Sequence, residues 1–372
     1  MQVLHLMMSK LMTYMKAATA SIDLNALEHN LNQIKSKAPQ CKVMSVVKAN
    51  GYGHGLLHIA KHSKNSDAFG VARIEEALQL RAGGIVKPIL LLEGFYSSGD
   101  LPILVTNNIQ TVVHCEEQLS ALENADLETP VVVWLKVDSG MHRLGVRPEQ
   151  YQNFVERLHQ CANVAKPLRY MSHFGCADEL DRATTVEQTE LFLSLTDGCE
   201  GERSLAASAG LLAWPNSHLD WVRPGIISYG VSPFADKSAQ ELGFKPVMTL
   251  TSHLIAVRDV KAGESVGYGA NWTSERDTKV GVIAIGYGDG YPRMAPNGTP
   301  VFVNGRKVPI AGRVSMDMLT VDLGPDAADQ VGDEATLWGK GLPSEEVADH
   351  IGTIAYELVT KLTSRVAMEY VK

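Results

Sequence analysis

The chain has 372 residues, and 34 Lys and Arg against 42 Asp and Glu give it a formal net charge of −8. Hydrophobic residues make up 45% and charged residues 20%, a balance that allows a large core and excludes wholesale disorder. The acidic charge argues against a nucleic-acid partner or an anionic membrane surface. The length predicts one large α/β domain with a smaller one, or two mid-sized domains.

The five cysteines are scattered and form no CxxC pair, so neither a disulfide framework nor a zinc ribbon is indicated. We therefore expect a cytoplasmic protein. No apolar stretch approaches the roughly 20 residues of a membrane-spanning helix. His142, His173 and Asp178 match no metal-ligand spacing, and we expect no metal site.

From residue 22 onward, strand-like and helix-like segments alternate. The strand-like segments are short, continuous apolar runs, as expected of parallel strands buried on both faces. They occupy residues 41–48, 68–72, 89–92, 111–114 and 131–137, and more weakly 169–174, 204–207 and 225–228. Helical patterns lie between them, at 24–37, 74–82, 116–125, 148–161 and 185–195. This rhythm predicts a (β/α)8 TIM barrel, and periodicity alone leaves a doubly wound sheet open.

The pattern changes near Pro246, after which short runs are punctuated by glycine. These β-like runs occupy residues 248–257, 279–285, 299–303, 307–312 and 319–323. Asn304-Gly305 between two of them predicts a hairpin. Residues 344–352 predict a helix capped by Ser344.

Three segments follow from this pattern. We predict an N-terminal extension at 1–17 that contacts the β-domain, a barrel at 18–246, and a mostly antiparallel β-domain at 247–372.

Active sites of β/α barrels lie just beyond the strand ends. Lys48 closes the first apolar run, so it is either a snorkelling or salt-bridged lysine or one used for imine chemistry. His173 closes the sixth run, where a satisfied core histidine is the commoner case. Ser208 and residues 223–226 fall where barrels bind phosphate. A lysine, a phosphate site and an arginine together indicate a phosphate-bearing carbonyl cofactor, and pyridoxal phosphate fits that description.

At this point the chain shows a family resemblance. Residues 46–55 (VVKANGYGHG) resemble the cofactor-attachment motif of alanine racemases. Further blocks of that family follow in family order, at 135–145 (LKVDSGMHRLG), 172–174, 222–226, 266–269, 286–290 and 312–318. The resemblance implies a barrel followed by a β-domain and bound pyridoxal 5'-phosphate. It also implies interconversion of L-alanine and D-alanine by a two-base proton transfer on the cofactor aldimine, which supplies D-alanine for peptidoglycan.

The resemblance also implies roles for single residues. Lys48 would attach the cofactor and act as the base on one face, and Tyr268 would be the base on the other face. His173 and Arg223 would support Tyr268, with Arg223 also facing the pyridine nitrogen.

The same resemblance assigns binding residues. The phosphate would lie on Tyr52, Ser208 and the backbone near Gly225 and Ile226. Arg143 and Met316 would bind the substrate. Tyr287, Asp178 and Arg293 would line the channel through which the substrate enters. Lys136 matches a lysine that is often carbamylated in the family.

Finally, the resemblance implies a head-to-tail homodimer in which Tyr268, Tyr287 and Met316 act in the partner's site. Three alternatives are a broad-specificity amino-acid racemase, a non-catalytic pyridoxal-phosphate carrier, and a barrel decarboxylase with the same cofactor. The second domain argues against the carrier. The absence of any cysteine after Cys199 argues against the decarboxylase. A panel of amino-acid substrates distinguishes the first alternative.

Overall fold

The computed structural model describes residues 16–372, and the chain divides into two compact units. One is Leu24–Val247, called here the barrel unit. The other, the β unit, joins Met248–Lys372 to the residues up to Asp23. Within the described part of the chain, none of the helices combines the length and apolar character needed to cross a bilayer.

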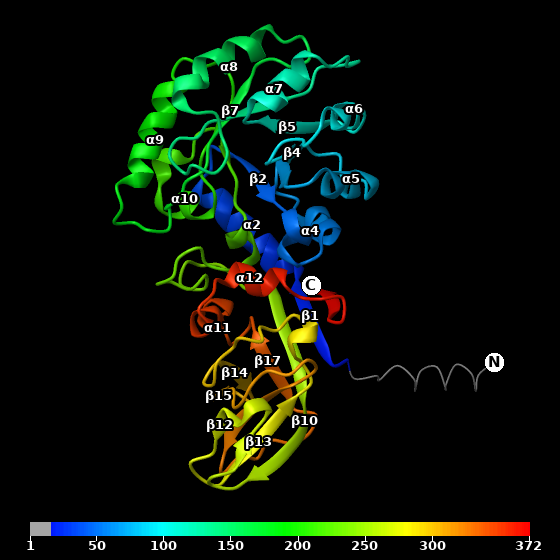
Figure 1. Ribbon diagram of the computed structural model, residues 1–372, viewed down its shortest axis with the longest axis vertical. Coiled ribbons are helices and arrows are strands. Elements are labelled where there is room, and N and C mark those ends of the chain that lie inside the picture. The colour runs from blue at the N-terminus through cyan, green and yellow to red at the C-terminus, as the bar shows by residue number, and fades with distance from the viewer. Residues whose placement is uncertain (1–15) are drawn as a thin grey trace, which may run out of the picture. The chain divides into compact units, whose positions relative to one another are not determined.

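The barrel unit is a closed barrel of eight parallel strands that follow one another in chain order, with helices around them (Figure 1). The strands are β2 (Lys42–Val46), β3 (Ala68–Val71), β4 (Ile89–Leu91), β5 (Ile109–Val113), β6 (Val133–Lys136), β7 (Arg169–Met171), β8 (Arg203–Ser204) and β9 (Trp221–Val222). The helices are α2 (Leu24–Lys37), α3 (Lys48–Tyr52), α4 (Leu56–His62), α5 (Ile74–Ala82), α6 (Leu101–Thr106), α7 (Glu116–Glu123), α8 (Pro148–Gln160), α9 (Thr184–Leu195) and α10 (Ser208–Ala213). The predicted (β/α)8 fold is confirmed, and the doubly wound sheet is excluded because β9 pairs with β2.

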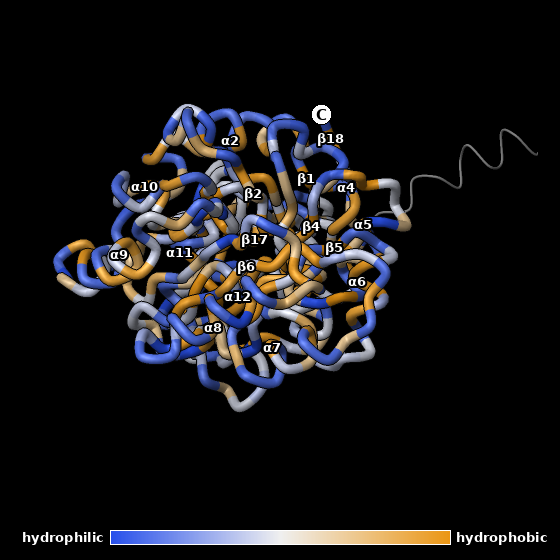
Figure 2. The backbone as a smooth tube through the Cα atoms, turned by 90° about the horizontal axis from the view of Figure 1, so that it is seen from above, coloured by the Kyte–Doolittle hydropathy of each residue, from blue (hydrophilic) through white to orange (hydrophobic). Residues whose placement is uncertain are grey.

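The interior of the barrel is filled by side chains. A single apolar cluster collects one buried residue from each of seven strands: Met44, Ala68, Leu90, Val112, Trp134, Met171 and Trp221. The rings of Trp134 and Trp221 meet edge to face at 6.1 Å. Helix α9 carries hydrophobic and hydrophilic residues in alternation along its length (Figure 2), and it buries Thr185, Gln188, Thr189 and Phe192. A packed interior leaves the strand ends as the place for chemistry.

The predicted eighth strand at 225–228 is wrong. Strand β9 is Trp221–Val222, and Ile226–Tyr229 forms a 3-10 turn, η3. Pro224 has no N–H to donate to a strand ladder, and the apolar residues that follow it are buried in the turn instead. A short apolar run looks the same in either case. As a result Arg223 lies just after the last strand rather than before it.

The β unit has one large sheet around the 13-residue strand β10 (Met248–Val260), which pairs with three other strands. The other strands are β1 (Ala18–Asp23), β11 (Ser265–Val266), β12 (Trp272–Thr273), β13 (Thr278–Ile283), β14 (Pro300–Val303), β15 (Arg306–Pro309), β16 (Leu319–Gly324), β17 (Glu334–Trp338) and β18 (Ala367–Val371). The helices of this unit are α11 (Ser344–Ile351) and α12 (Ala355–Thr360). All pairings among the named strands are antiparallel except that of β1 with β18.

Local predictions in the β unit fare differently. The hairpin is confirmed: Asn304 and Gly305 both have positive φ, 46° and 80°, and they join β14 to β15. The predicted helix is present as α11, but its cap is not Ser344. Pro343 occupies the capping position without a side-chain hydrogen bond, and Ser344 Oγ donates to Glu345.

The predicted start of the barrel at residue 18 is also wrong. Ala18–Asp23 is strand β1, which pairs with β10 and β18 in the sheet of the β unit. This short strand gains its stability from partners more than 220 residues away, so local periodicity could not assign it. The expected contact of residues 1–17 with the β-domain falls mostly outside the described residues. Of the described ones, Lys16 pairs with Glu369 at 2.6 Å.

Candidate active site

Lys48 lies directly beyond strand β2, at the start of a turn with an unusual backbone. The φ angles are 52° at Ala49, 56° at Asn50, 63° at Gly51 and 51° at Tyr52, so four consecutive residues are left-handed. This conformation costs an L-residue about 1–2 kcal/mol because Cβ approaches the following carbonyl oxygen. Three of the four residues carry a Cβ, so the surrounding structure must hold the turn in place.

The predicted phosphate ligands come together around Gly225. A Cβ at this glycine would stand 2.5 Å from Tyr52 Oη, so only glycine allows the tyrosine to approach. Ser208 Oγ accepts hydrogen bonds from the amides of Gly225, at 3.0 Å, and Ile227, at 3.4 Å. Ile226 opens turn η3, a position where an amide has no partner inside its own helix. Hydroxyls and backbone amides around a glycine suit an anion such as a phosphate.

The Tyr52 side chain is held as a neutral phenol. Burial raises the pKa of Tyr52 to about 12. Its ring stacks on Tyr229 with centroids 5.0 Å apart, and Tyr229 Oη donates to Val46 O of strand β2. Tyr52 therefore keeps its hydroxyl proton at neutral pH.

Arg223 is a buried cation at the end of β9, with 3% of its surface exposed. Its guanidinium donates to Ser204 Oγ at 2.5 Å and to Ser172 O at 2.6 Å. Burial lowers the pKa of Arg223 to about 10, so the group stays charged at neutral pH. Three carbonyl and hydroxyl acceptors from neighbouring strand ends fix its direction, the third being Leu205 O.

His173 meets this arginine. Arg223 Nη2 lies 3.4 Å from His173 Nδ1. Burial, followed by the charge of Arg223, holds the pKa of His173 well below its usual range, so the ring is neutral. Since a guanidinium can only donate, Nδ1 accepts and the ring proton sits on Nε2. His173 therefore offers an N–H donor on its far side.

Lys136 is a second buried cation, at the end of β6. Its Nζ is 3.4 Å from Leu92 O. Burial and then the charges of Arg223 and Arg143 lower the pKa of Lys136 to about 8. The charge of Lys48 acts in the same direction on both Lys136 and His173, which places Lys48 within electrostatic range of this group.

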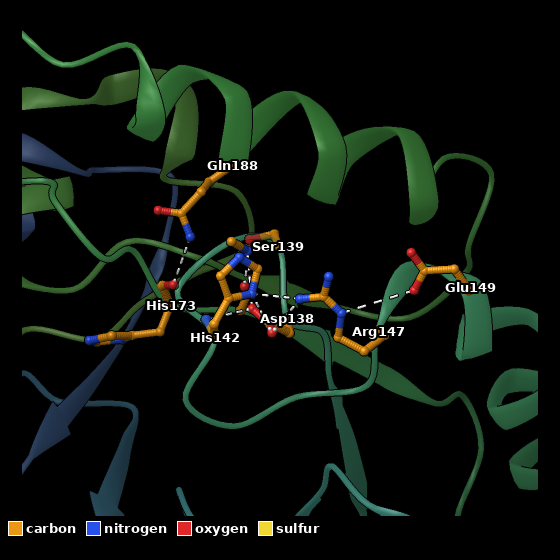
Figure 3. Close-up of polar contacts among 9 residues, drawn as sticks. Asp138, Ser139, His142, Arg147, Glu149, His173 and Gln188 are labelled. Atoms are coloured by element: carbon orange, nitrogen blue, oxygen red, sulfur yellow. Dashed lines mark hydrogen bonds and ion pairs between the residues drawn. The ribbon is translucent and has the colours of Figure 1, made fainter.

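Arg143 lies on the loop after β6, which is closed by a bridge between Val137 and Val146. Asp138 organises this loop, and Figure 3 shows its contacts with His142 and Arg147. The carboxylate of Asp138 accepts the amides of Gly140 and His142, at 3.1 and 2.9 Å, and Arg147 Nη1 at 3.0 Å. Burial opposes ionisation of Asp138, but the hydrogen bonds from His142 and its other donors outweigh it and lower the pKa to about 2. The loop that carries Arg143, the predicted substrate-binding residue, is therefore held by the ionised carboxylate of Asp138.

The loops of Arg143 and His173 are also tied to each other. Ser139 Oγ and Ser172 Oγ are 2.8 Å apart. Gln188, from α9, donates to His173 O at 3.2 Å and accepts the Gly175 amide at 3.0 Å (Figure 3). The barrel unit thus brings the predicted cofactor residues into one group. Asp178 lies further along the His173 loop and is exposed.

The predicted residues of the β unit gather on three neighbouring loops. Tyr287 N–H donates to Ser315 O, and Gly288 N–H donates to Met316 O, at 3.0 and 2.8 Å. Asn297 joins the other loops, because it accepts the amide of Gly312 and donates to Asn271 O, three residues beyond Tyr268. Arg293, six residues after Tyr287 in the chain, is exposed.

These loops present large side chains to solvent. Tyr268 is 70%, Met316 52% and Tyr287 38% exposed. Two of these loops are tied to each other, since Arg365 bridges Asp289 at 3.1 Å and Asp317 at 2.7 Å. These ion pairs join the loops of Tyr287 and Met316.

The sequence interpretation missed three residues that organise the site. Asp138 lies inside the family block at 135–145, but the resemblance implies no role for it. Gln188 carries no local signal for its contacts with the His173 loop. Glu76 lies three residues after Arg73, and because arginine has no acceptor for a capping box, the sequence carries no capping signal there. Its carboxylate accepts the Ala49 amide beside Lys48 at 2.6 Å.

Comparison with known proteins accounts for both units. Residues 22–233 match the family described as "Alanine racemase, N-terminal domain", and residues 247–370 match "Alanine racemase, C-terminal domain". The chain is 97% identical over 358 residues to an alanine racemase of Vibrio atlanticus, covering 96% of this chain and all of that protein. It is 82% identical over 356 residues to an alanine racemase of Vibrio cholerae, covering 96% and 99%.

A solved structure agrees in fold. The crystal structure of biosynthetic alanine racemase from Pseudomonas aeruginosa superimposes with a TM-score of 0.93 at 46% identity, covering 96% of this chain and all of that one. The family matches together span well over half of the sequence, and the relatives cover nearly all of it. The chain belongs to the alanine racemase family.

Proposed function

We propose that Lys48 and Tyr268 carry out the two proton transfers by which this enzyme interconverts L-alanine and D-alanine with pyridoxal phosphate as its cofactor. The product D-alanine serves peptidoglycan synthesis. The observation that carries the assignment of Lys48 is its position at a barrel strand end, on the same left-handed turn as Tyr52 of the phosphate cradle.

The residues of the barrel unit fit this cofactor. Tyr52, Ser208 and the amides around Gly225 and Ile226 would hold its phosphate, in the cradle that a Cβ on Gly225 would fill. Lys48 would attach its carbonyl carbon. When bound, pyridoxal phosphate withdraws electrons from the substrate α-carbon and so acidifies the α-proton.

Racemisation needs two proton carriers on opposite sides of the α-carbon, because the proton must leave one side and return to the other. The amine of Lys48 takes or gives the proton on one side. The phenol of Tyr268 does so on the other side.

His173 and Arg223 make the tyrosine a usable base. A free tyrosine has a pKa of about 10 and is a poor base near neutrality. The neutral ring of His173 carries its proton on Nε2, as its contact with Arg223 requires. A donor of this kind stabilises a phenolate, and the fixed charge of Arg223 adds to the effect. Arg223 would also face the pyridine nitrogen of the cofactor, where its fixed positive charge would disfavour protonation of the ring.

The substrate carboxylate is held by Arg143 and by the backbone amide of Met316. The pKa of about 8 leaves part of Lys136 as a neutral amine near neutrality, which is the form that reacts with carbon dioxide. A carbamate on Lys136 would convert a buried cation into an anion and orient Arg143 by a charge-assisted hydrogen bond.

The enzyme acts as a head-to-tail homodimer in the cytoplasm. In support, Tyr268, Met316 and Tyr287 are large side chains exposed on the β unit, as expected of groups that a second chain covers. Tyr287, Asp178 and Arg293 would then line a narrow channel to the cofactor, which selects alanine over bulkier amino acids. The five free thiols suit a reducing compartment.

Exchange in deuterated water tests the assignment. The purified enzyme is incubated with L-alanine, and both D-alanine and α-deuterium incorporation are followed for the parent, Lys48→Ala and Tyr268→Phe. We expect Lys48→Ala to lose both signals. Tyr268→Phe should lose D-alanine formation from L-alanine by at least about 100-fold, the usual scale of a general acid–base group. Racemisation at the parental rate in Tyr268→Phe would show that the two-base assignment is wrong. Comparable turnover of lysine, arginine or methionine would overturn the preference for alanine.

A further inference from the structure

Glu76, in the first turn of α5, connects two strand ends of the barrel because its carboxylate accepts hydrogen bonds from backbone amides at both. Its Oε1 accepts the Ala49 amide at 2.6 Å, immediately after Lys48. Its Oε2 accepts the amides of Ala72 and Arg73, at 3.0 and 3.2 Å, beyond strand β3. One half-buried carboxylate therefore serves both the turn of the cofactor lysine and the start of its own helix.

Glu76 holds the peptide at which the left-handed turn begins. Ala49 is the first of the four left-handed residues, and its conformation is unfavourable for an L-residue. Inside the turn, two side chains add to backbone hydrogen bonds such as Gly53 N–H to Ala49 O. Asn50 Oδ1 accepts the Leu56 amide at 3.0 Å, and His54 Nδ1 lies 2.8 Å from Tyr52 O. Glu76 adds a charged acceptor from a different element at the point where the turn begins.

The turn matters because it points two groups into one site. Lys48 precedes it and acts electrostatically on Lys136 and His173. Tyr52 ends it and approaches Gly225. If the Ala49 peptide relaxed to an ordinary right-handed conformation, the chain would leave Lys48 along another path, and Tyr52 would no longer lie against Gly225.

We propose that Glu76 is a positioning residue of the cofactor site, which keeps the left-handed turn that aims Lys48 and Tyr52 at one ligand. This rests on the proposed function of those two residues. A simpler role, as the capping residue of α5 alone, makes a different prediction. A capping box accepts Gln as well as Glu at this position, so Glu76→Gln preserves a cap. The Gln amide has one acceptor oxygen and an NH2 group, so it cannot serve the cap and Ala49 at once.

The test compares the parent, Glu76→Gln and Glu75→Gln as holoenzymes. Glu75 neighbours Glu76 and is exposed, so its variant matches the charge change. Equilibrium dialysis gives the dissociation constant of pyridoxal phosphate, steady-state assays give kcat and KM for L-alanine, and melting gives Tm. We expect Glu76→Gln to raise the dissociation constant and lower kcat by about tenfold or more, the range for losing a hydrogen bond to a charged group. KM and Tm should change little, and Glu75→Gln should match the parent.

A double-mutant cycle with Ala49→Gly tests the route through the turn. Glycine adopts positive φ without a Cβ clash. A turn that begins with glycine at this position should therefore depend less on the hydrogen bond to Glu76. We expect Glu76→Gln to raise the dissociation constant less in the Ala49→Gly background than in the parent. If Glu76→Gln raises the dissociation constant equally in both backgrounds, Glu76 does not act through Ala49. If Glu76→Gln leaves the dissociation constant unchanged, Glu76 is a helix cap only.

Two further variants keep these outcomes distinct. If Glu76→Gln does not fold, Glu76→Asp replaces it, since it retains the charge but falls short of Ala49; the same rise in dissociation constant is expected. Lys48→Ala is assayed in parallel. Racemisation by Lys48→Ala would overturn the proposed function itself. Loss of activity in Lys48→Ala with an unaffected Glu76→Gln would overturn the positioning role alone.

Discussion

Buried charge at single residues controls how the barrel site behaves. Arg223 and Lys136 are buried cations without a carboxylate in direct contact among the described residues. Burial lowers the pKa of His173, and the charges of these two cations lower it further, so the ring stays neutral. Asp138 is the opposite case, a buried anion surrounded by donors. Because each group has few or no alternatives for solvation, small changes at these positions have large effects.

Asp138→Asn should destabilise the enzyme and loosen the Arg143 loop. The pKa of Asp138 is depressed to about 2, so its charge adds stability that is complete above its unfolded pKa and is lost as pH falls through about 2. We expect a loss of about 2 kcal/mol in the free energy of unfolding at pH 7, with a higher KM for alanine. Urea unfolding at fixed protein concentration measures the free energy of unfolding, and steady-state assays measure the KM. Asp126 is exposed, so Asp126→Asn is the control. Equal free energies of unfolding for the two variants would contradict the role of Asp138 in holding the loop.

Lys136 should take up carbon dioxide. A pKa of about 8 means that the neutral, reactive amine increases as pH rises through that value. We expect a carbamate signal in the carbon NMR spectrum of enzyme prepared with labelled bicarbonate, stronger at pH 9 than at pH 7, in the parent and in the exposed control Lys37→Ala. The signal should vanish in Lys136→Ala; if it persists there, another lysine carries the modification.

At the scale of elements, the phosphate cradle depends on a close approach between the end of α3 and the start of η3. Gly225→Ala places a Cβ 2.5 Å from Tyr52 Oη and 3.2 Å from its Cζ, so the ring must move away from the cradle. We expect the dissociation constant of pyridoxal phosphate to rise by about tenfold or more, while kcat of the saturated enzyme falls less. Gly99→Ala is the control, since its Cβ would meet nothing closer than 3.5 Å. Equal cofactor affinity in both variants would exclude the cradle.

At the scale of the whole molecule, a site shared between two chains predicts complementation. Lys48→Ala and Tyr268→Phe should each be inactive as homodimers. A mixed dimer would contain one site with both changes and one site with neither, so unfolding and refolding the two variants together should restore up to about a quarter of the parental activity. Activity is measured as D-alanine formed from L-alanine. If both residues of a site came from one chain, no mixture would regain activity.

Much of this protein was predictable from sequence because its signals are local. Continuous apolar runs predicted strands β2 to β6, and Asn304-Gly305 predicted its hairpin, since buried strands and type I′ turns depend on nearby residues. The family blocks named most of the candidate site, residue by residue.

The tertiary structure alone decided three matters. β1 belongs to the sheet of the β unit, Arg223 follows rather than precedes the last barrel strand, and the carboxylates of Glu76 and Asp138 organise the loops of Lys48 and Arg143. The physical reason is the same for each. A strand partner or a hydrogen-bond acceptor from another element is chosen by long-range register and packing, whereas hydrophobic periodicity records only which side of a segment is buried.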